Sequence, residues 1–233
     1  DSQWMADEKL AKNEPLYRGT KFVDEEEELD EYSFGDTATD DDLSYNDKSR
    51  MGRTPYAINH QAITAIEESP LKKGLLYVGT DDGRVWMRDG EKAAFTLTIK
   101  GLPQNAHVSR IVASAKEVGR VYLTLSNRRE DDNAPYVFVS NDKGATWTSI
   151  ASNLPAAPVN VIREDNKYPT HLYCGTDMGI YVSTNSGKQW SSLQANLPAV
   201  VSVQDLFIHP RDRNLVIATY GRGVYVLDQI DIK

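Results

Sequence analysis

One short motif occurs twice in this chain, with the two copies 43 residues apart. The first copy, from Ser140 to Trp147, is Ser-Asn-Asp-Lys-Gly-Ala-Thr-Trp, and the second, from Ser183 to Trp190, is Ser-Thr-Asn-Ser-Gly-Lys-Gln-Trp. Short polar side chains in a tight turn accept backbone N–H groups, and Gly supplies the positive φ that closes a hairpin. The Trp then buries its ring over the sheet edge, which contributes up to about 3 kcal/mol. The repetition predicts two equivalent hairpins.

Other landmarks recur with a similar period. Leu-Pro pairs begin at positions 102, 154 and 197, and Gly-Thr or Ala-Thr pairs begin at 79, 175 and 218. Between them lie short alternating runs split by Gly, Pro, Asn and Asp, which are typical of strands and turns. A period of roughly 40–50 residues with about four strands per unit is the pattern of β-propeller blades. We therefore predict an all-β fold with about four four-stranded antiparallel blades, at about 62–103, 108–155, 159–198 and 202–229.

The third unit can be divided strand by strand. We expect its four strands at 159–162, 171–176, 180–183 and 189–193. The fourth unit offers only three strands, at 203–208, 215–219 and 223–227. Its outer strand is therefore expected to be missing, and an unpaired sheet edge recruits a partner. Because four blades close a ring only with difficulty, we expect a partner chain or further residues to complete it.

The repeated motif fits the Asp-box pattern Ser-x-Asp-x-Gly-x-Thr-Trp. The first copy matches at every specified position, and the second has Asn for Asp and Gln for Thr. We favour a structural role over a sialidase-like active site, because the turn lies at the blade periphery whereas propeller ligands usually lie near the axis. The residues assigned to this structural role are Ser140, Asp142, Gly144, Trp147, Ser183, Asn185, Gly187 and Trp190.

Residues 62–230 resemble the last blades of sortilin-like (VPS10-type) proteins with BNR repeats, which in bacteria are often labelled glycosyl hydrolases. The matching stretches lie at 66–70, 76–83, 158–165 and 217–228. The resemblance implies a many-bladed propeller that is secreted, periplasmic or at the cell surface. Two departures stand out: such propellers have more blades than this chain supplies, and residues 14–22 look like the segment that follows the propeller.

The first 50 residues differ in composition from the rest. Residues 1–48 hold 16 Asp and Glu against 5 Lys and Arg, whereas the remainder holds 18 acidic and 21 basic residues. Runs such as 24–28 and 40–42 repel themselves, so we expect an acidic, largely irregular arm over 1–50 and a partial propeller over 51–233. A calcium site over 36–42 lacks the ligand spacing of an EF-hand. Neither part has the basic stripe that nucleic-acid binding needs.

Several other features are absent from the sequence. No run of about 18 apolar residues predicts a membrane span, and the N-terminus has no signal-peptide pattern. The single cysteine, Cys174, cannot form an intrachain disulfide, and we expect it to be a small buried residue in a strand. No metal or cofactor is expected, because the histidines lack ligand spacing and no Gly-rich phosphate loop appears. These histidines are His60, His107, His171 and His209.

The candidate binding residues lie in loops. In a propeller, loops between second and third strands share a face with the loops that join successive blades, and such loops are natural carriers of binding. The insertion at 127–135 is longer than a hairpin needs, which fits a contact with a ligand as well as a plain solvated loop. The ligand-binding candidates are Arg128, Arg129, Asp131, Asp132, Tyr220 and Arg222.

Two functions of different class fit the sequence. We favour a non-catalytic interaction module that binds a protein, peptide or glycan within a larger secreted or envelope-associated assembly. The alternative is a glycoside hydrolase resembling the Asp-box xyloglucanases, which needs two carboxylates about 5–9 Å apart. Its candidate catalytic residues are Asp81, Asp82 and Asp177, although their turns also fit plain hairpins. A sialidase-type site built from Arg128, Arg129, Arg222 and Tyr220 is not required by their spacing.

Overall fold

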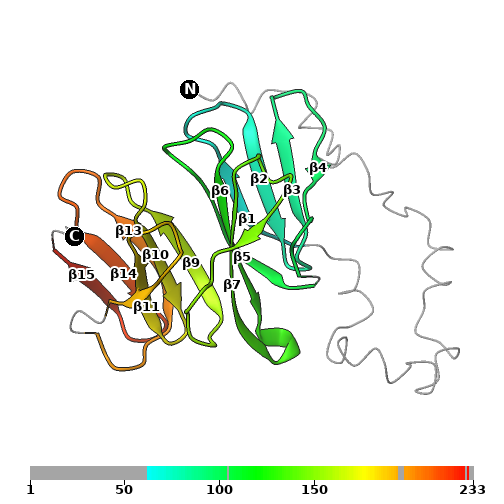
Figure 1. The fold of residues 1–233 in the computed structure, drawn as a ribbon. Coiled ribbons are helices and arrows are strands. Elements are labelled where there is room, and N and C mark those ends of the chain that lie inside the picture. Colours follow the sequence, from blue (N-terminus) through cyan, green and yellow to red (C-terminus); the bar gives the residue numbers. More distant parts are fainter. Residues whose placement is uncertain (1–61, 104, 194–196, 229, 231–233) are drawn as a thin grey trace, which may run out of the picture. The chain divides into compact units, whose positions relative to one another are not determined.

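The computed structural model describes residues 62–103, 105–193, 197–228 and 230, which form four antiparallel sheets in chain order (Figure 1). Blade 1 contains β1 (Ile63–Glu68), β2 (Leu75–Thr80), β3 (Val85–Asp89) and β4 (Thr96–Leu97). Blade 2 contains β5 (His107–Ala113), β6 (Val121–Asn127), β7 (Asp132–Ser140) and β8 (Thr148–Ser149). Blade 3 contains β9 (Val159–Glu164), β10 (Leu172–Thr176), β11 (Gly179–Ser183) and β12 (Ser191–Ser192). Blade 4 contains β13 (Val203–Ile208), β14 (Leu215–Thr219) and β15 (Val224–Leu227).

Each sheet is a meander in which strands pair in sequence order. The first strand of every blade has a register shift near its start, between Ile63 and Ala65 in blade 1 and at the equivalent place in the others. A β-bulge of this kind bends the strand and increases its twist. Its recurrence shows that the four sheets are copies of one unit, and the predicted fold class of β-propeller blades is confirmed.

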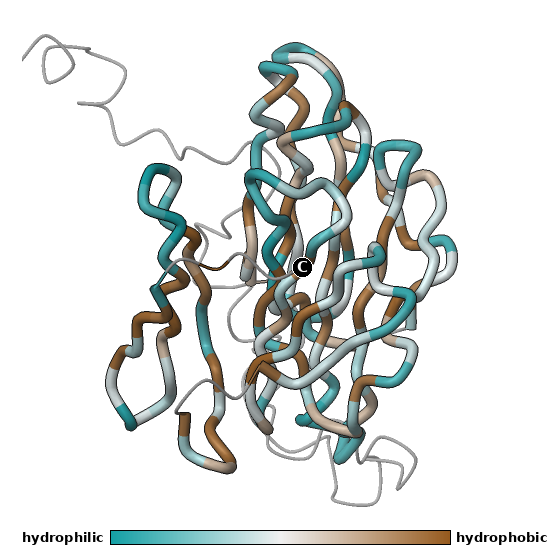
Figure 2. The backbone as a smooth tube through the Cα atoms, turned by 60° about the vertical axis from the view of Figure 1, so that its left-hand side comes forward, coloured by the Kyte–Doolittle hydropathy of each residue, from teal (hydrophilic) through white to brown (hydrophobic). Residues whose placement is uncertain are grey.

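Successive blades pack through their first strands, because β1 contacts β5, β5 contacts β9, and β9 contacts β13. Three buried apolar clusters fill the spaces between blades 1 and 2, blades 2 and 3, and blades 3 and 4. Figure 2 shows the matching pattern along the chain, with apolar strands joined by hydrophilic turns. The core of the described chain is therefore divided into layers between neighbouring sheets.

Two predictions about strands have different outcomes. Blade 4 has three strands in the described residues, as expected. The fourth strand of blade 3 was predicted at 189–193 but is limited to Ser191–Ser192, and this boundary was wrong. The Asp-box turn extends to Trp190, whose buried ring fixes the backbone just before the strand. The acidic arm over 1–50 and the 36–42 run lie outside the described residues.

The first Asp-box is held together by its own side chains. The Ser140 hydroxyl accepts the backbone N–H of Gly144 at 2.8 Å and donates to the Asp142 carboxylate at 2.6 Å. Asp142 also accepts the backbone N–H and the hydroxyl of Thr146, at 2.9 and 2.6 Å. Gly144 has φ of 94°, a conformation that costs glycine little. The hairpin is thus specified by local hydrogen bonds.

The second Asp-box repeats the same geometry with Asn in the acidic position. Ser183 donates to Oδ1 of Asn185 at 2.9 Å and accepts the backbone N–H of Gly187 at 2.9 Å. The same Oδ1 accepts the backbone N–H of Gln189 at 2.9 Å. An amide oxygen therefore replaces one carboxylate oxygen without loss of the turn.

The Asp-box tryptophans lie between blades. The indole N–H of Trp147 donates to the backbone oxygen of Thr98 in blade 1, and that of Trp190 donates to Ile150 in blade 2. Both rings are buried in the interblade clusters. Cys174 is buried between blades 2 and 3, which confirms its expected place, and burial raises the pKa of its thiol.

Candidate functional site: an arginine-lined pocket on the loop face

Two classes of loop meet on one face of the blades. The backbone N–H of Asp81, after β2, donates to Ala62, which precedes β1. In blade 3 the N–H of Asp177 donates to Pro158 in the same way. The loops between second and third strands therefore adjoin the segments that enter each blade. We call this surface the loop face.

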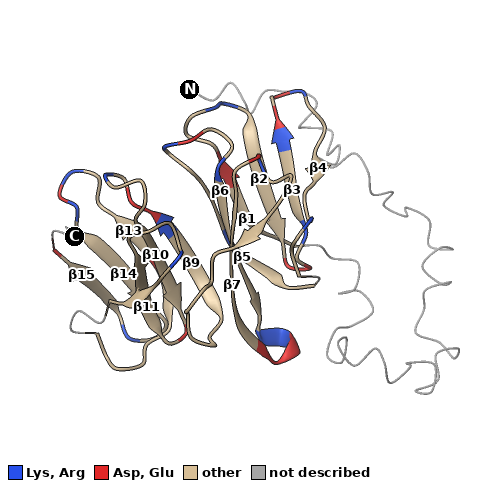
Figure 3. Ribbon diagram, viewed as in Figure 1, with Lys and Arg blue, Asp and Glu red and all other residues tan. Residues whose placement is uncertain are grey.

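Most residues of the insertion at 127–135 belong to regular secondary structure. β6 continues to Asn127, and a 3₁₀ turn, η4 (Arg128–Glu130), joins it to β7. Asp131 follows in the left-handed region with φ of 58°. Figure 3 shows basic and acidic residues together at this tip of the β6–β7 hairpin. The loop is a short hairpin end that carries two arginines.

The Asp132 carboxylate stabilises this hairpin end through hydrogen bonds to three neighbouring residues. Its carboxylate accepts the Tyr136 hydroxyl at 2.6 Å, the Asn127 amide at 3.1 Å and the backbone N–H of Ala134 at 2.9 Å. These hydrogen bonds, the one from Tyr136 foremost, lower the pKa of Asp132. Asp132 therefore supports the loop, and Asp131 is exposed beside it.

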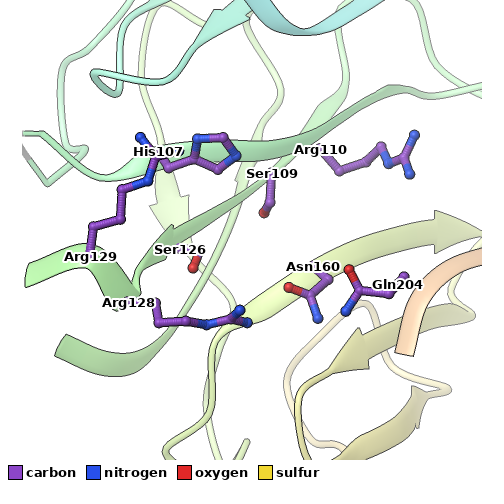
Figure 4. Close-up of a pocket in the computed structure, with 8 residues that line it drawn as sticks. All are labelled: His107, Ser109, Arg110, Ser126, Arg128, Arg129, Asn160 and Gln204. Carbon is purple, nitrogen blue, oxygen red and sulfur yellow. The ribbon is translucent and has the colours of Figure 1, made fainter. Parts of the chain in front are cut away.

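A cavity of about 320 Å³ opens among the first strands and η4. Figure 4 shows Arg128 and Arg129 extending from η4 toward it, with His107 and Arg110 on β5 and with Asn160 and Gln204 on the next two first strands. Its complete lining in the described residues is His107, Ser109, Arg110, Ser126, Arg128, Arg129, Asn160 and Gln204. None of these residues is acidic. We call this cavity the arginine pocket.

The arginines of the pocket have acidic partners outside its lining. Arg128 pairs with Asp177, and Arg129 lies 3.8 Å from Asp81. Arg110 pairs with Asp205 at 3.0 Å. The Arg128 and Arg129 side chains are more than half exposed, and solvent weakens ion pairs of this kind. An incoming anion can therefore compete for both guanidinium groups.

Two buried polar atoms of the pocket have no hydrogen-bond partner in the described structure, Nδ1 of His107 and Nε of Arg110. Buried polar atoms are normally paired, so each of these atoms is a place where a ligand or water can bind. Burial, helped by the charge of Arg129 and opposed by Asp81, lowers the pKa of His107. The imidazole is therefore neutral at pH 7, and the positive charge of the pocket comes from arginine.

The candidate catalytic carboxylates occupy separate loops. Asp81 and Asp82 follow β2 of blade 1, whereas Asp177 follows β10 of blade 3. Asp82 accepts the Thr80 hydroxyl and pairs with Arg84. Asp81 accepts the backbone N–H of Ala62 at 3.1 Å, so both carboxylates of blade 1 already take part in structural interactions.

Asp177 has the most partners of these three carboxylates. Besides Arg128, it accepts the Asn160 amide at 2.9 Å and the Ser202 hydroxyl at 2.7 Å. It thus joins blade 2, blade 3 and the entry to blade 4.

The structure separates the other sequence-predicted residues. Tyr220 and Arg222 lie exposed in the β14–β15 loop and do not line the arginine pocket. Sequence reasoning missed the pocket residues on the first strands. A signal for some of them was present, because Ser109, Asn160 and Gln204 occupy equivalent places just after the first aliphatic residue of each strand.

The described residues contain no cluster of three or more His, Cys, Asp or Glu suited to holding a metal ion. Nor do the described segments include an apolar helix of the length needed to cross a lipid bilayer.

The repeated blades, their Asp-boxes and their interblade tryptophans agree with the family comparison. Residues 135–229 match the Sortilin-Vps10 family model, described as sortilin, neurotensin receptor 3. The resemblance to sortilin-like Asp-box propellers is confirmed. The match runs from within β7 to just after β15, which is about two fifths of the chain. A search of curated protein sequences found no match.

Solved structures that superpose on this chain come from different kinds of protein. The GH74 xyloglucanase from Xanthomonas campestris superposes with a TM-score of 0.55 at 16% identity, over 67% of this chain and 26% of that one. YCF48 bound to the D1 peptide gives 0.53 at 16% identity, over 73% and 52%. The extracellular domain of the one component system BT4673 from B. thetaiotaomicron gives 0.55 at 15%, over 73% and 21%.

These likenesses show the fold alone, because each identity is below 25%. The chain spans about a quarter of the xyloglucanase and about half of YCF48. The same blades are thus found in a glycoside hydrolase, in a protein solved with a peptide and in an extracellular domain.

Proposed function

We propose that this chain is a non-catalytic interaction module that binds an acidic segment of a protein or peptide in the arginine pocket. The observation that carries the proposal is the composition of the lining: three arginines, with hydroxyl and amide donors between them, and no carboxylate among the described lining residues. Arginine binds carboxylates through a rigid fork of N–H donors, which suits this class of ligand.

Binding is favoured over glycoside hydrolysis by two further observations. The catalytic candidates Asp81 and Asp177 lie on different blades and already accept other donors. Trp147 and Trp190, which could stack on sugars if exposed, are buried between blades. The peptide in the YCF48 structure is an example of peptide binding by a protein of similar fold.

We also propose the setting of the module. It spans 51–233 with blades at about 62–103, 108–155, 159–198 and 202–229, and its ring is completed by further blades or by a protein partner. Because similar folds occur in extracellular domains of B. thetaiotaomicron, we place the module in the cell envelope or outside the cell. The Asp-box residues keep a structural role in this scheme.

The class of ligand can be tested by calorimetric titration of the full chain with three probes. They are a Glu-rich peptide, the same peptide with Gln for each Glu, and a xyloglucan oligosaccharide. We expect only the Glu-rich peptide to bind, with an affinity that falls as salt is added, because salt screens exposed charges. Binding of the oligosaccharide without binding of the acidic peptide would contradict the proposal and favour the hydrolase.

A further inference from the structure

Arg128 and Arg129 are consecutive residues of η4, yet their guanidinium groups pair with different blades. Arg129 faces Asp81 in blade 1, and Arg128 contacts Asp177 in blade 3. Figure 4 shows the two side chains diverging from η4. The two most exposed arginines of the arginine pocket are therefore each held by a carboxylate of a neighbouring blade.

The two carboxylates occupy equivalent places in their blades. Each comes directly after the last residue of a second strand, which is Thr80 in β2 and Thr176 in β10. The residue of β6 at the same register is Leu125, but this strand runs on to Asn127 before η4 begins. Because β6 is longer than its counterparts, the arginines of η4 reach the turns of the blades on both sides.

The Asp177 carboxylate divides its two oxygens between the blades and an arginine. Oδ1 accepts the Asn160 amide at 2.9 Å and the Ser202 hydroxyl at 2.7 Å. Oδ2 contacts Nη2 of Arg128. If Arg128 leaves, the carboxylate keeps two hydrogen bonds from neutral donors, and its place in the loop is maintained.

The Asp81 carboxylate is divided in the same way. Oδ1 accepts the backbone N–H of Ala62 at 3.1 Å, and Oδ2 lies 3.8 Å from Nη1 of Arg129. This distance is longer than a hydrogen bond, so the interaction is an ion pair alone. Asp81 therefore holds its arginine less tightly than Asp177 holds Arg128, which is within hydrogen-bond distance.

Both internal pairs leave donors of the guanidinium group available. Each arginine faces its aspartate through one nitrogen, whereas the carboxylate of a ligand can accept two parallel N–H bonds from one guanidinium group. Ion pairs of exposed arginines are also weak. An acidic ligand can therefore displace either aspartate, but part of its binding free energy is used to break the internal pair.

We propose that Asp81 and Asp177 compete with the ligand for Arg129 and Arg128, and that they thereby lower the affinity of the arginine pocket for acidic peptides. The inference rests on the proposed binding function and adds two residues that determine its strength. Neither aspartate lines the pocket. Loss of a supporting residue weakens binding, whereas loss of a competitor strengthens it, so the sign of the effect separates the two roles.

Asparagine is the informative replacement for both aspartates. It keeps an oxygen acceptor for the neutral donors and removes the negative charge that faces the arginine. Asp82→Asn is the matched control, because Asp82 lies in the same turn as Asp81 but pairs at 3.2 Å with Arg84, which does not line the pocket. The control removes the same charge from the loop face without releasing a pocket arginine. Circular dichroism checks that each variant is folded.

The test is calorimetric titration of the full chain and its variants with the Glu-rich peptide at low salt. We expect Asp177→Asn to bind about two- to fivefold more tightly than the wild type, the range that an exposed ion pair supplies. Asp81→Asn should gain less, because its pair is longer, and the double variant should gain more than either. Asp82→Asn should bind as the wild type does.

A second comparison tests whether Asp177 acts through Arg128. In the Arg128→Ala background the competitor has no arginine to hold, so the addition of Asp177→Asn should leave the affinity unchanged. A gain of the same size in both backgrounds would show a general effect of charge and would overturn the inference. An equal gain in Asp82→Asn would do the same.

The inference and the proposed function fail in different ways. If the wild type binds the peptide and the Asp81→Asn/Asp177→Asn double variant binds no more tightly, the competitors are removed and the binding function stands. If no protein binds, the double variant included, both are overturned. Binding by the double variant alone would support both, because the internal pairs would then mask the pocket in the wild type.

Discussion

The indole N–H of Trp147 donates to the backbone oxygen of Thr98 at 3.1 Å, across the interface between blades 2 and 1. The backbone N–H of Trp147 donates to the backbone oxygen of Lys100, two residues after Thr98 in blade 1. The Asp-box thus joins neighbouring blades as well as closing its own hairpin. Trp190 repeats the relationship one blade later, with Ile150 as the acceptor at 2.8 Å.

Replacing Trp147 by Ala should destabilise the chain strongly. Truncation of a buried Trp typically costs about 3–5 kcal/mol, because it removes apolar contacts and leaves a cavity. Here it also leaves the Thr98 oxygen without this donor. The free energy of unfolding in urea measures the effect, and Tyr220→Ala, which removes an exposed ring, should change it little. A Trp147→Ala chain as stable as the wild type would contradict the interblade role.

The Asp142 carboxylate should make stability depend on pH at the acidic end. Hydrogen bonds from Ser140, then from Thr146, lower its pKa to about 2. A lowered folded-state pKa gives stability that is present above the unfolded-state pKa, about 3.9, and is lost as pH falls toward 2. Thermal unfolding from pH 5 to pH 2 measures this loss.

Asp142→Asn is the informative variant at this position, because Asn185 already serves in the second Asp-box. We expect it to keep the fold and to show a smaller loss of melting temperature between pH 5 and pH 2. An identical pH dependence in both proteins would show that Asp142 is not the titrating group.

A buried ion pair joins blades 3 and 4. Asp165 is fully buried and accepts two bonds from Arg213, at 3.1 and 3.0 Å. Burial alone would raise the pKa of Asp165, but Arg213 and the backbone N–H groups of Tyr168 and Lys167 hold it below its usual value. Removing one partner of a buried pair typically costs about 3–5 kcal/mol, so Arg213→Ala should destabilise the chain by this order.

Arg211→Ala is the matched control for Arg213. Arg211 pairs with Asp212 at 2.7 Å, but its side chain is exposed, and such pairs contribute little. Urea unfolding should show a large shift for Arg213→Ala and almost none for Arg211→Ala. Equal shifts in the two variants would contradict a specific role for the buried pair.

The hydrolase alternative predicts that the wild type turns over xyloglucan and that substitution of a catalytic carboxylate abolishes this turnover. We expect no release of reducing sugar from xyloglucan by the wild type, by Asp81→Asn or by Asp177→Asn. Turnover by the wild type that either substitution abolishes would establish a catalytic carboxylate and contradict the non-catalytic function.

The features predicted from sequence are those that short segments determine. The turns at Ser140 and Ser183, the three strands that the described residues give blade 4, and the buried Cys174 all follow from local pattern. The outer strand of blade 3 was predicted too long, because the motif alone does not show how much backbone the Trp190 ring fixes.

The pocket was only partly predictable, because its walls come from three blades. Arg128 and Arg129 were found through the length of their loop, whereas His107 and Arg110 were not. In a strand whose polar and apolar residues alternate, the polar residues are normally predicted to face solvent. Only the stacking of blades shows that such residues on successive first strands meet around one cavity.

The most direct test of the binding function is titration of the Arg128→Ala/Arg129→Ala double variant with the Glu-rich peptide, beside the wild type and Arg211→Ala. Both arginines of η4 are more than half exposed, so their removal should leave the fold intact. We predict that the double variant loses binding by at least about tenfold, a difference of about 1.4 kcal/mol, while Arg211→Ala binds as the wild type does. Equal affinity in all three proteins would contradict the arginine pocket as the binding site.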